Sequence, residues 1–309
     1  MKRDFISLDD WTRAEMAVLF ELAAKLKRDR SYWGEHLRGK SVGLVFQKPS
    51  NRTRVSFEVG VFQLGGNCVY LGPDEINLGV RESTADVAKT LSRYLEGIVA
   101  RTFTHQDIVD LAKYASVPVI NGLSDMQHPC QALTDIFSIE EKFGKTKGIV
   151  LAYVGDGNNN VCHSLLIGCA KMGIHMHIAT PKKYAPDKEV LKLAKAFAQE
   201  TAARIFLTHS PKEAVTGADV IYSDVWVSMG QEKQAAKRLK DFKGFQINGN
   251  LVKGAKKDFA FMHCLPAHRG QEVTADVIDG SHSIVFGQAE NRLHVQKAIM
   301  AFLIQKSGS

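Results

Sequence analysis

The sequence predicts an α/β protein with two doubly wound parallel sheets, joined by a long helix, and a last helix that packs back on the first domain. Strand-like and helix-like segments alternate along the 309 residues. A long helical segment at 129–143 separates two such series, which indicates two domains. We expect these domains to comprise residues 1–145 with the C-terminal helix (about 288–309), and residues 146–287.

The first series is predicted from apolar periodicity. The first helix is expected at about 9–29, because Ser7-Leu8-Asp9-Asp10 is a polar start signal. The strands are expected at 41–47, 67–71, 97–101 and 117–121, and further helices near 52–64, 84–95 and 105–115. Pro129 suits the first turn of the long helix, and Gly144 suits its end.

The second series begins after Gly148. Its strands are expected at 149–154, 174–180, 203–208, 219–224, 259–263 and 284–286. A last helix over about 288–305 closes the chain. Parallel sheets of this kind bind ligands beyond the carboxyl ends of their strands. Six polar clusters follow predicted strands, which favours one shared cleft between the domains over six unrelated loops.

Composition excludes several classes of protein. No run of about 18 apolar residues exists, so we expect no membrane span. The N-terminus lacks an apolar signal core, which predicts a cytoplasmic protein. The five cysteines form no CxxC pair, which is typical of reduced thiols. The net charge is +7, but the lysines are dispersed without interleaved aromatic residues, so we expect no nucleic-acid partner. A small anionic substrate explains the surplus equally well.

The segment from Lys48 to Arg54 has the clearest chemistry. It follows a predicted strand and precedes Val55, Val59 and Phe62, whose spacing predicts a helix. A helix N-terminus has unpaired N–H groups and a positive dipole end, so it binds anions. Arg52 and Arg54 add forked donors suited to phosphate. A capped helix with two solvated arginines is the alternative.

Three further clusters follow strands. Arg101 ends the third strand, where it could polarise a carbonyl oxygen or pair with an acid. His128 and Gln131 lie three residues apart, where they can face one ligand. With Cys130, His128 lacks a second matched pair of metal ligands, so no metal is expected. The segment Gly155–Asn160 departs from GxGxxG because Asn160 replaces the third glycine, which disfavours a dinucleotide cofactor and a dehydrogenase.

The remaining clusters lie in the second half of the chain. Asp224 could pair with a substrate ammonium group or cap the helix near 231–240. Ser228 to Gly230 could form a mobile loop. Cys264 lies near histidine and arginine, where its thiol could be activated or simply buried. Arg292, in the last helix, could return to the cleft or remain on the surface.

Together these clusters resemble the aspartate/ornithine carbamoyltransferase family, and most closely its ornithine-specific members. Ser50-Asn51-Arg52-Thr53-Arg54 resembles the family's Ser-Thr-Arg-Thr-Arg loop, with Asn51 at a usual threonine. His128-Pro129-Cys130-Gln131 resembles its His-Pro-x-Gln element. Asp224 to Gly230 and His263-Cys264-Leu265-Pro266 resemble two signatures of the ornithine-specific enzymes.

The resemblance implies that carbamoyl phosphate and ornithine react to give citrulline and phosphate, without cofactor or metal, in a homotrimer or a multiple of trimers. It implies catalytic roles for Arg101, His128, Asp224 and Cys264. The residues implied for carbamoyl phosphate are Ser50, Asn51, Arg52, Thr53, Asn77, Arg101, His128, Gln131, Cys264, Leu265 and Arg292. Those implied for ornithine are Asn160, Asp224, Ser228 and Met229. Putrescine, N-acetylornithine and aspartate remain alternative acceptors, and a non-catalytic binding module is the alternative from another class.

Overall fold

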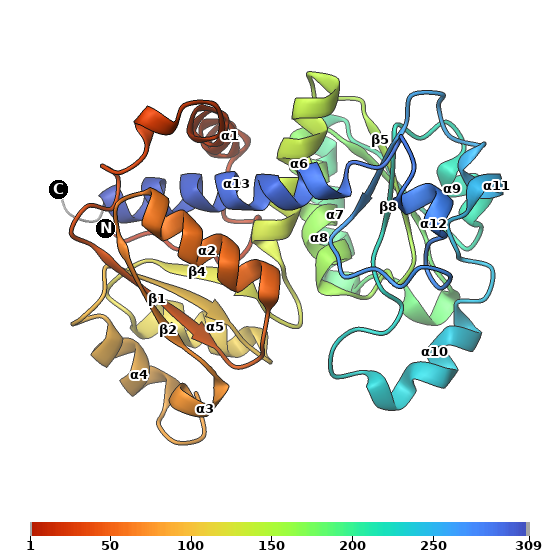
Figure 1. Ribbon diagram of the computed structural model, residues 1–309. Helices are drawn as coiled ribbons and strands as arrows, with labels where there is room; N and C mark the ends of the chain where they lie inside the picture. Colours follow the sequence, from red (N-terminus) through yellow and green to blue (C-terminus); the bar gives the residue numbers. More distant parts are fainter. Residues whose placement is uncertain (1, 307–309) are drawn as a thin grey trace. The chain divides into compact units, whose positions relative to one another are not determined.

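The computed structural model describes residues 2–306 and divides into two compact units (Figure 1). The first unit comprises Met1–Thr134 and Glu290–Ser309, and the second comprises Asp135–Ala289. Each unit contains one parallel β-sheet with helices, which confirms the predicted fold class. The boundaries between the units fall inside the helix at Pro129–Phe143 and the last helix at Val285–Lys306 rather than in loops.

The first unit contains a four-stranded parallel sheet with the order β2-β1-β3-β4. Its strands are β1 (Ser41–Phe46), β2 (Asn67–Leu71), β3 (Gly97–Arg101) and β4 (Val119–Leu123). Its helices are α1 (Arg13–Arg28), the 3-10 turn η1 (Arg30–Tyr32), α2 (Asn51–Gln63), α3 (Pro73–Ile76), α4 (Thr84–Leu91), α5 (His105–Tyr114), the start of α6 (Pro129–Phe143) and most of α13 (Val285–Lys306). Apolar side chains of α4 and α5 pack with β1, β3 and β4 into one core.

Two helices in this unit differ from the sequence-based expectation. The first helix begins later than predicted, at Arg13, because Thr12 caps it and Glu15 reaches back to the N–H of Thr12. Helix α2 forms as expected, but its side chains Val55 and Phe62 are 50% and 79% exposed. The buried face of α2 contains Phe57 and Val61 instead.

The C-terminal helix packs on the first unit as predicted. A β-carbon at Gly97 of β3 would lie 2.7 Å from Cδ1 of Ile304, so glycine permits the close approach of α13 to the sheet. Gly60 of α2 likewise faces the methyl of Met300, where a β-carbon would lie at 3.2 Å. The ammonium of Lys40 donates to the carbonyl of Ile304 at 2.8 Å. These contacts attach α13 to residues of the first unit that lie about 200 or more positions earlier in the sequence.

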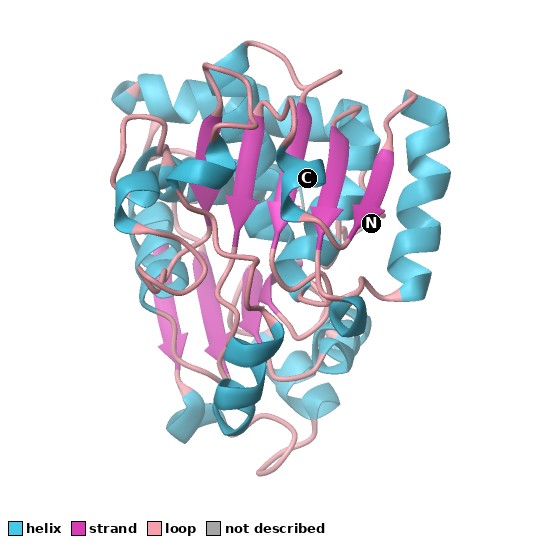
Figure 2. Ribbon diagram, turned by 90° about the vertical axis from the view of Figure 1, so that its right-hand side faces the viewer, coloured by secondary structure: helices cyan, strands magenta, loops and turns pink. Residues whose placement is uncertain are grey.

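The second unit contains a five-stranded parallel sheet with the order β7-β6-β5-β8-β9, and Figure 2 shows its strands with helices on either side. The strands are β5 (Val150–Val154), β6 (His175–Ala179), β7 (Ile205–Thr208), β8 (Val220–Ser223) and β9 (Ala260–His263). The helices are the rest of α6, α7 (Asn160–Met172), α8 (Lys188–Thr201), α9 (Pro211–Val215), α10 (Ala235–Asp241), α11 (Gly249–Val252), α12 (Ala275–Ile278) and the start of α13, with 3-10 turns η2 (Lys182–Tyr184) and η3 (Glu232–Gln234).

One predicted strand of this unit is wrong. Residues 284–286 form no strand: Ser283 makes an isolated bridge to Phe261, and α13 begins at Val285. The remaining strands lie within two residues of their predicted ends. Helix α7 lies in the interior of this unit, where every residue from Val161 to Met172 is buried.

Each sheet has a point where the strand order reverses. In the first unit the chain passes from β1 to β2 on one side and then to β3 on the other side of β1. In the second unit the chain passes from β5 outward to β7 and returns to β8 beside β5. Loops diverge at such a reversal and leave a crevice at the carboxyl ends of the strands. These two points therefore predict where each unit binds its ligand.

No helix within residues 2–306 combines the length and the apolar character that crossing a membrane requires. The longest, α13, is interrupted by charged and polar side chains.

Candidate functional site

The predicted residues gather at the two points of strand reversal. In the first unit they follow β1, β3 and β4, except Arg292, which lies in α13; β1 and β3 are paired at Phe46 and Arg101. In the second unit they follow β5, β8 and β9. We call the first group the anion site (Ser50, Asn51, Arg52, Thr53, Arg101, His128, Gln131 and Arg292) and the second the carboxylate cluster (Asn159, Asp224, Cys264 and Leu265).

The N-terminus of α2 forms one wall of the anion site. Ser50 is its N-cap, with an extended backbone, and its hydroxyl accepts from the N–H of Thr53 at 3.3 Å. Helix geometry leaves the N–H groups of Asn51 and Arg52 without partners inside the helix. These donors and the positive end of the helix dipole favour an anion at this place.

Arg292 of α13 joins three elements of the anion site. Its Nη1 donates to Oε1 of Gln131 at 2.6 Å, and its Nη2 donates to Oγ1 of Thr53 at 3.1 Å. All three side chains are buried. The structure therefore brings together α2, α6 and α13, although their contact residues are far apart in the sequence.

Arg101 and His128 lie in a strongly positive environment. Arg101 is only 7% exposed, and its Nε has no hydrogen-bond partner among the residues that the structure describes. Burial, and then the charges of Arg292 and Arg52, lower the pKa of Arg101 to about 10. Burial also lowers the pKa of His128, with the same cations adding to the shift. At neutral pH Arg101 is therefore charged and His128 neutral, so His128 can donate a hydrogen bond without adding charge.

Lys48, which is not among the predicted site residues, also belongs to this positive group. Burial and the charge of Arg101 lower the pKa of the Lys48 ammonium to about 8, although Asp125 opposes the shift. The ammonium also lies 5.4 Å from the ring centre of Phe103. Crowded cations raise the free energy of the empty site, and a bound anion would lower it. Lys48 directly precedes the predicted phosphate turn, which is the signal that could have identified it.

Asn77 does not join the anion site through any hydrogen bond described in the structure. It follows α3 and has a left-handed backbone with φ of 42°. Its carbonyl accepts from the N–H groups of Val80 and Arg81. The structure therefore shows Asn77 shaping its own loop, and its contact with a ligand stays a prediction.

Asp224 is the centre of the carboxylate cluster. It follows β8 and is buried. Its Oδ1 accepts from the N–H of Val225 at 2.7 Å and from the thiol of Cys264 at 3.0 Å. Its Oδ2 accepts from Nδ2 of Asn159 at 3.0 Å. Asp224 thus caps no helix near 231–240 in the structure, and its carboxylate is fixed by donors from three strand ends.

Asn159, which is not among the predicted site residues, contacts Asp224. Asn159 is the N-cap of α7, where its side chain accepts from the N–H of Cys162 at 2.8 Å. Its amide also donates to the hydroxyl of Tyr153 at 2.9 Å. Asn160 is the first residue of α7 and is only partly buried. The predicted contact of Asn160 with ornithine stays a prediction.

Cys264 and Leu265 follow β9 in a turn fixed by His263. The N–H of Leu265 donates to Nδ1 of His263 at 2.9 Å, and Nε2 of His263 lies 3.3 Å from Oε1 of Glu272. Leu265 has a left-handed backbone with φ of 56°. Such conformations are uncommon for a side chain of this size and concentrate at functional sites. The turn directs the thiol of Cys264 to Asp224.

Ser228 and Met229 lie beyond the buried part of the segment that begins at Asp224. Exposure increases along this segment, and Met229 is 58% exposed. The N–H of Ser228 donates to Oε1 of Gln231 at 3.1 Å, and the N–H of Gly230 donates to Oε1 of Glu232 at 2.9 Å. The structure describes no contact of the Ser228 or Met229 side chain with Asp224. This arrangement fits an open loop.

Asp224, His263 and Cys264 place possible metal-ligand atoms within 4.8 Å of one another. Their oxygen, nitrogen and sulfur donors would suit a zinc ion. However, Nδ1 of His263 already accepts from Leu265, and both oxygens of Asp224 accept internal hydrogen bonds. A metal would have to displace these contacts, so the arrangement favours the internal network.

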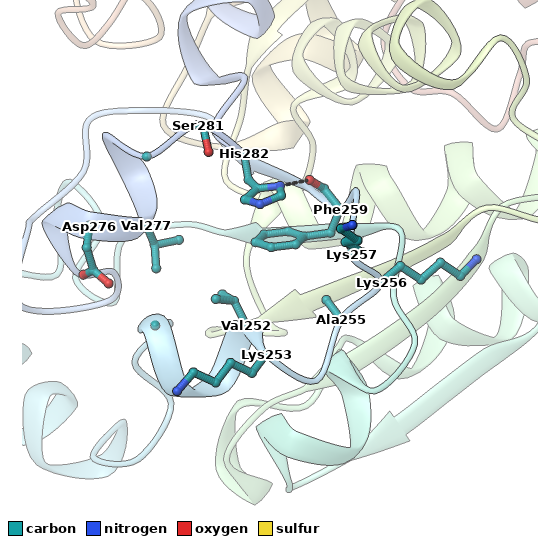
Figure 3. Close-up of a pocket in the computed structure, with 12 residues that line it drawn as sticks. Val252, Lys253, Ala255, Lys256, Lys257, Phe259, Asp276, Val277, Ser281 and His282 are labelled. Carbon is teal, nitrogen blue, oxygen red and sulfur yellow. Dashed lines mark hydrogen bonds between the residues drawn. The ribbon is translucent and has the colours of Figure 1, made fainter.

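A hollow of about 410 Å³ also lies in the second unit, next to α11 and α12. Figure 3 shows the ring of His282 stacked on Phe259, at 4.3 Å between ring centres, with Lys253 and Asp276 at the rim. None of the predicted site residues lines this hollow. The chemistry-bearing residues therefore lie at the strand ends and not in this hollow.

Comparisons with known proteins agree with the two-unit arrangement. Residues 3–141 match the description "Aspartate/ornithine carbamoyltransferase, carbamoyl-P binding domain", and residues 147–303 match its "Asp/Orn binding domain". The ornithine carbamoyltransferase of Thermococcus kodakarensis is 54% identical, over 98% of this chain and 96% of that protein. The anabolic ornithine carbamoyltransferase of Pyrococcus furiosus is 52% identical, over the same shares of the two chains.

A solved structure gives the same result for the fold. The ornithine carbamoyltransferase structure from Pyrococcus furiosus has a TM-score of 0.95 and 52% identity, and the match covers 98% of this chain and 97% of that one. Both family descriptions, the sequence identity and the fold agree over nearly the whole length. The chain therefore belongs to the aspartate/ornithine carbamoyltransferase family.

Proposed function

We propose that this protein transfers the carbamoyl group of carbamoyl phosphate to the δ-amine of L-ornithine, giving L-citrulline and phosphate. The observation that carries this proposal is the group of cations around the N-terminus of α2, where burial and the charges of Arg292 and Arg52 lower the pKa values of Arg101 and His128. Such a site suits an acyl phosphate, whose phosphate and carbonyl oxygens both accept hydrogen bonds. The choice of ornithine as the acceptor is supported by the relatives that are named ornithine carbamoyltransferase.

Carbamoyl phosphate would bind in the anion site. The hydroxyl of Ser50, the N–H groups of Asn51 and Arg52, and Thr53 would hold the phosphate. Arg101 and His128 would hold the carbamoyl oxygen, and Gln131 would orient the carbamoyl amide. Arg292 would fix Gln131 and Thr53 in place, as their hydrogen bonds support. Asn77, Cys264 and Leu265 complete the predicted set.

Ornithine would bind to the second unit. Asp224 would accept a hydrogen bond from an amino group of the substrate, since its carboxylate is fixed by Asn159 and Cys264. Asn160 would bind the α-amino acid end, and the loop with Ser228 and Met229 would close over the substrate.

The transfer requires one bond to form and one to break. The lone pair of the δ-amine attacks the carbamoyl carbon, and the bond from this carbon to the phosphate oxygen breaks with its electron pair. The nitrogen then loses its extra proton, which the leaving phosphate can take up. Arg52 and the N–H groups of α2 would stabilise the leaving phosphate, and Arg101 with neutral His128 would stabilise the oxyanion. The protein's contribution is positioning and electrostatics.

The attacking amine must first lose a proton. An alkylammonium has a pKa of about 10.4, so roughly one in a few thousand is neutral at pH 7, a penalty of about 4–5 kcal/mol. Asp224 and Cys264 are the nearest groups that could take up a proton at this place, and they are hydrogen-bonded to each other at 3.0 Å. The rate should therefore rise with pH through the neutral-to-alkaline range.

We further propose two functional domains, with residues 1–145 and about 288–309 for carbamoyl phosphate and 146–287 for ornithine. The two family descriptions support this division. We also propose that the chain acts in the cytoplasm in arginine biosynthesis. Five free cysteines suit a reducing compartment, and a relative named anabolic supports the direction.

We propose a homotrimer, or a multiple of trimers, as the assembly. The outward face of α2 supports this proposal because Val55, Val59 and Phe62 form an exposed apolar stripe. Exposed apolar stripes mark interaction surfaces. Val69 on the neighbouring edge strand β2 is also exposed, which extends the apolar surface.

The test is an assay of the purified chain with carbamoyl phosphate and each of four acceptors: ornithine, putrescine, N-acetylornithine and aspartate. Carbamoylation of ornithine alone is the expected result. Activity with a different acceptor would keep the anion site and overturn the assignment of Asp224 to Gly230. Binding of carbamoyl phosphate without any transfer would overturn the enzymatic proposal in favour of a binding module.

A further inference from the structure

Arg238 is a buried cation outside the residues assigned above. It lies on the short helix α10 and is only 4% exposed. Its Nη2 forms an ion pair with Oδ2 of Asp156, and its Nε donates to the backbone carbonyl of Trp226. Burying a charged guanidinium is costly unless it is paired and hydrogen-bonded. Both partners are therefore part of what keeps Arg238 in this place.

Aromatic rings fix the plane of the guanidinium. Its central carbon lies 4.8 Å from the ring centre of Tyr184 and 5.6 Å from that of Phe242. The rings of Trp226 and Phe242 are themselves stacked, at 5.7 Å and 15°. A planar, forked donor can stack between rings and bind two acceptors at once, which a lysine cannot do.

The two partners of Arg238 lie at functionally important ends of strands. Asp156 follows β5, and its backbone carbonyl accepts from the hydroxyl of Tyr153 at 3.1 Å. The same hydroxyl accepts from Asn159, which donates to Asp224. Trp226 is only two residues beyond Asp224. Arg238 thus connects the turn after β5, through Asp156, to the segment after β8, through Trp226.

Trp226 also marks a boundary in the segment from Asp224 to Gly230. The residues from Asp224 to Trp226 are buried, whereas Met229 and Gly230 are exposed. The contact with Arg238 lies at the last buried residue before the chain reaches solvent. It is therefore placed to hold one end of the loop while the rest moves.

We propose that Arg238 is a positioning residue for the acceptor substrate, which joins the Trp226 carbonyl to Asp156 and so holds Asp224 and the base of the Ser228–Gly230 loop in place. This inference rests on the proposed function for its kinetic consequence only. Arg238 touches neither substrate nor the reacting atoms. Its effect on the acceptor passes through Trp226 and the Asp156 turn.

The main test is Arg238→Met, which keeps an apolar side chain beside Tyr184 and Phe242 but removes both polar contacts. We expect KM for ornithine to rise about 10- to 100-fold, the factor that one or two charge-assisted hydrogen bonds contribute. The calorimetric affinity for carbamoyl phosphate should stay unchanged. Lys237→Met is the matched control, because Lys237 is an exposed cation on the same helix. It should leave both constants unchanged.

The double variant Asp156→Asn/Arg238→Met separates positioning from simple charge pairing. Arg238→Met alone leaves the Asp156 carboxylate buried without its cation, and burial already raises the pKa of this carboxyl. The double variant removes that unpaired charge, so its urea midpoint should recover, while KM for ornithine stays high. Recovery of both quantities, or an unchanged KM in folded Arg238→Met, would overturn the proposal. If Arg238→Met does not fold, Arg238→Lys carries the same test.

Hydrogen exchange tests the inference without any activity. Amides of residues 224–230 should exchange faster in Arg238→Met than in the wild-type chain, with no change at α7. If the wild-type chain fails to use ornithine, the proposed function fails and this result alone decides the role of Arg238. Unchanged exchange over residues 224–230 would show that Arg238 does not hold this segment.

Discussion

Binding of carbamoyl phosphate should draw a proton onto Lys48. The pKa of this ammonium in the empty protein is about 8, because burial and Arg101 disfavour its charge. At pH 8 about half of the Lys48 side chains are then neutral, and at pH 7 about one in ten. A unit negative charge about 5 Å away contributes about 3 kcal/mol at an effective dielectric constant near 20, which raises the pKa by about two units. Binding should therefore take up about 0.5 proton per site at pH 8 and about 0.1 at pH 7.

Calorimetry measures this uptake directly. A non-reactive phosphonate analogue of carbamoyl phosphate is titrated into the protein in two buffers of different ionisation enthalpy, and the proton number follows from the difference in heat. Titration of the free analogue gives the correction for its own ionisation. Lys48→Met should abolish the uptake at pH 8 while the analogue still binds through Arg52 and the helix N-terminus. Equal uptake in wild type and Lys48→Met would refute the assignment of Lys48 to the anion site.

Four further outcomes are expected. Arg52→Met should weaken analogue binding by about 10- to 100-fold with unchanged circular dichroism, and full affinity would contradict the role of the α2 turn. Cys264→Ser should lower kcat and alter the alkaline limb of the pH–rate profile, whereas an unchanged profile would make Cys264 a contact only. His128 has a lowered folded pKa, so below about pH 6.5 the unfolded chain binds the extra proton first and stability falls, by up to about 1.4 kcal/mol per pH unit. Urea midpoints of His128→Asn should fall less steeply between pH 7.5 and pH 5 than those of wild type, and parallel slopes would contradict this. Phe62→Glu should reduce the mass measured by light scattering toward that of one chain, because Phe62 is 79% exposed, and an unchanged trimeric mass would exclude α2 from the interface.

Local sequence signals correctly predicted the elements whose ends are marked by proline or glycine. Helix α6 spans Pro129–Phe143 as expected, because proline fits a first helical turn and Gly144 takes a left-handed backbone with φ of 69°. The predicted strand at 284–286 is wrong because three apolar residues cannot distinguish a strand from a helix start. Periodicity also could not tell which face of α2 is buried, since Val55 and Phe62 form its exposed side.

Contacts between residues far apart in the chain were harder to predict from the sequence. The turns after β1 and β8 were predicted because polar residues follow apolar strands. In contrast, Arg238 and Asp156 are 82 positions apart, and no local pattern marks a buried arginine on a short polar helix. Asn159 was not predicted, because only the backbone shows that it caps α7 and only the fold shows that its amide reaches Asp224. The residue types were visible in the sequence, whereas their pairing depends on the order of the strands.

The reversal of strand order in two separate sheets has a consequence for how specificity can diversify. Most residues proposed for carbamoyl phosphate follow β1, β3 and β4 or lie in α13, whereas those proposed for ornithine follow β5 and β8. Substitutions among the proposed ornithine residues should therefore leave the side chains proposed to hold phosphate unchanged. The family descriptions follow this separation, since one domain is described by carbamoyl phosphate alone and the other by either of two amino acids. A laboratory search for new amine acceptors should accordingly randomise the loops of the second sheet and keep the first sheet unchanged.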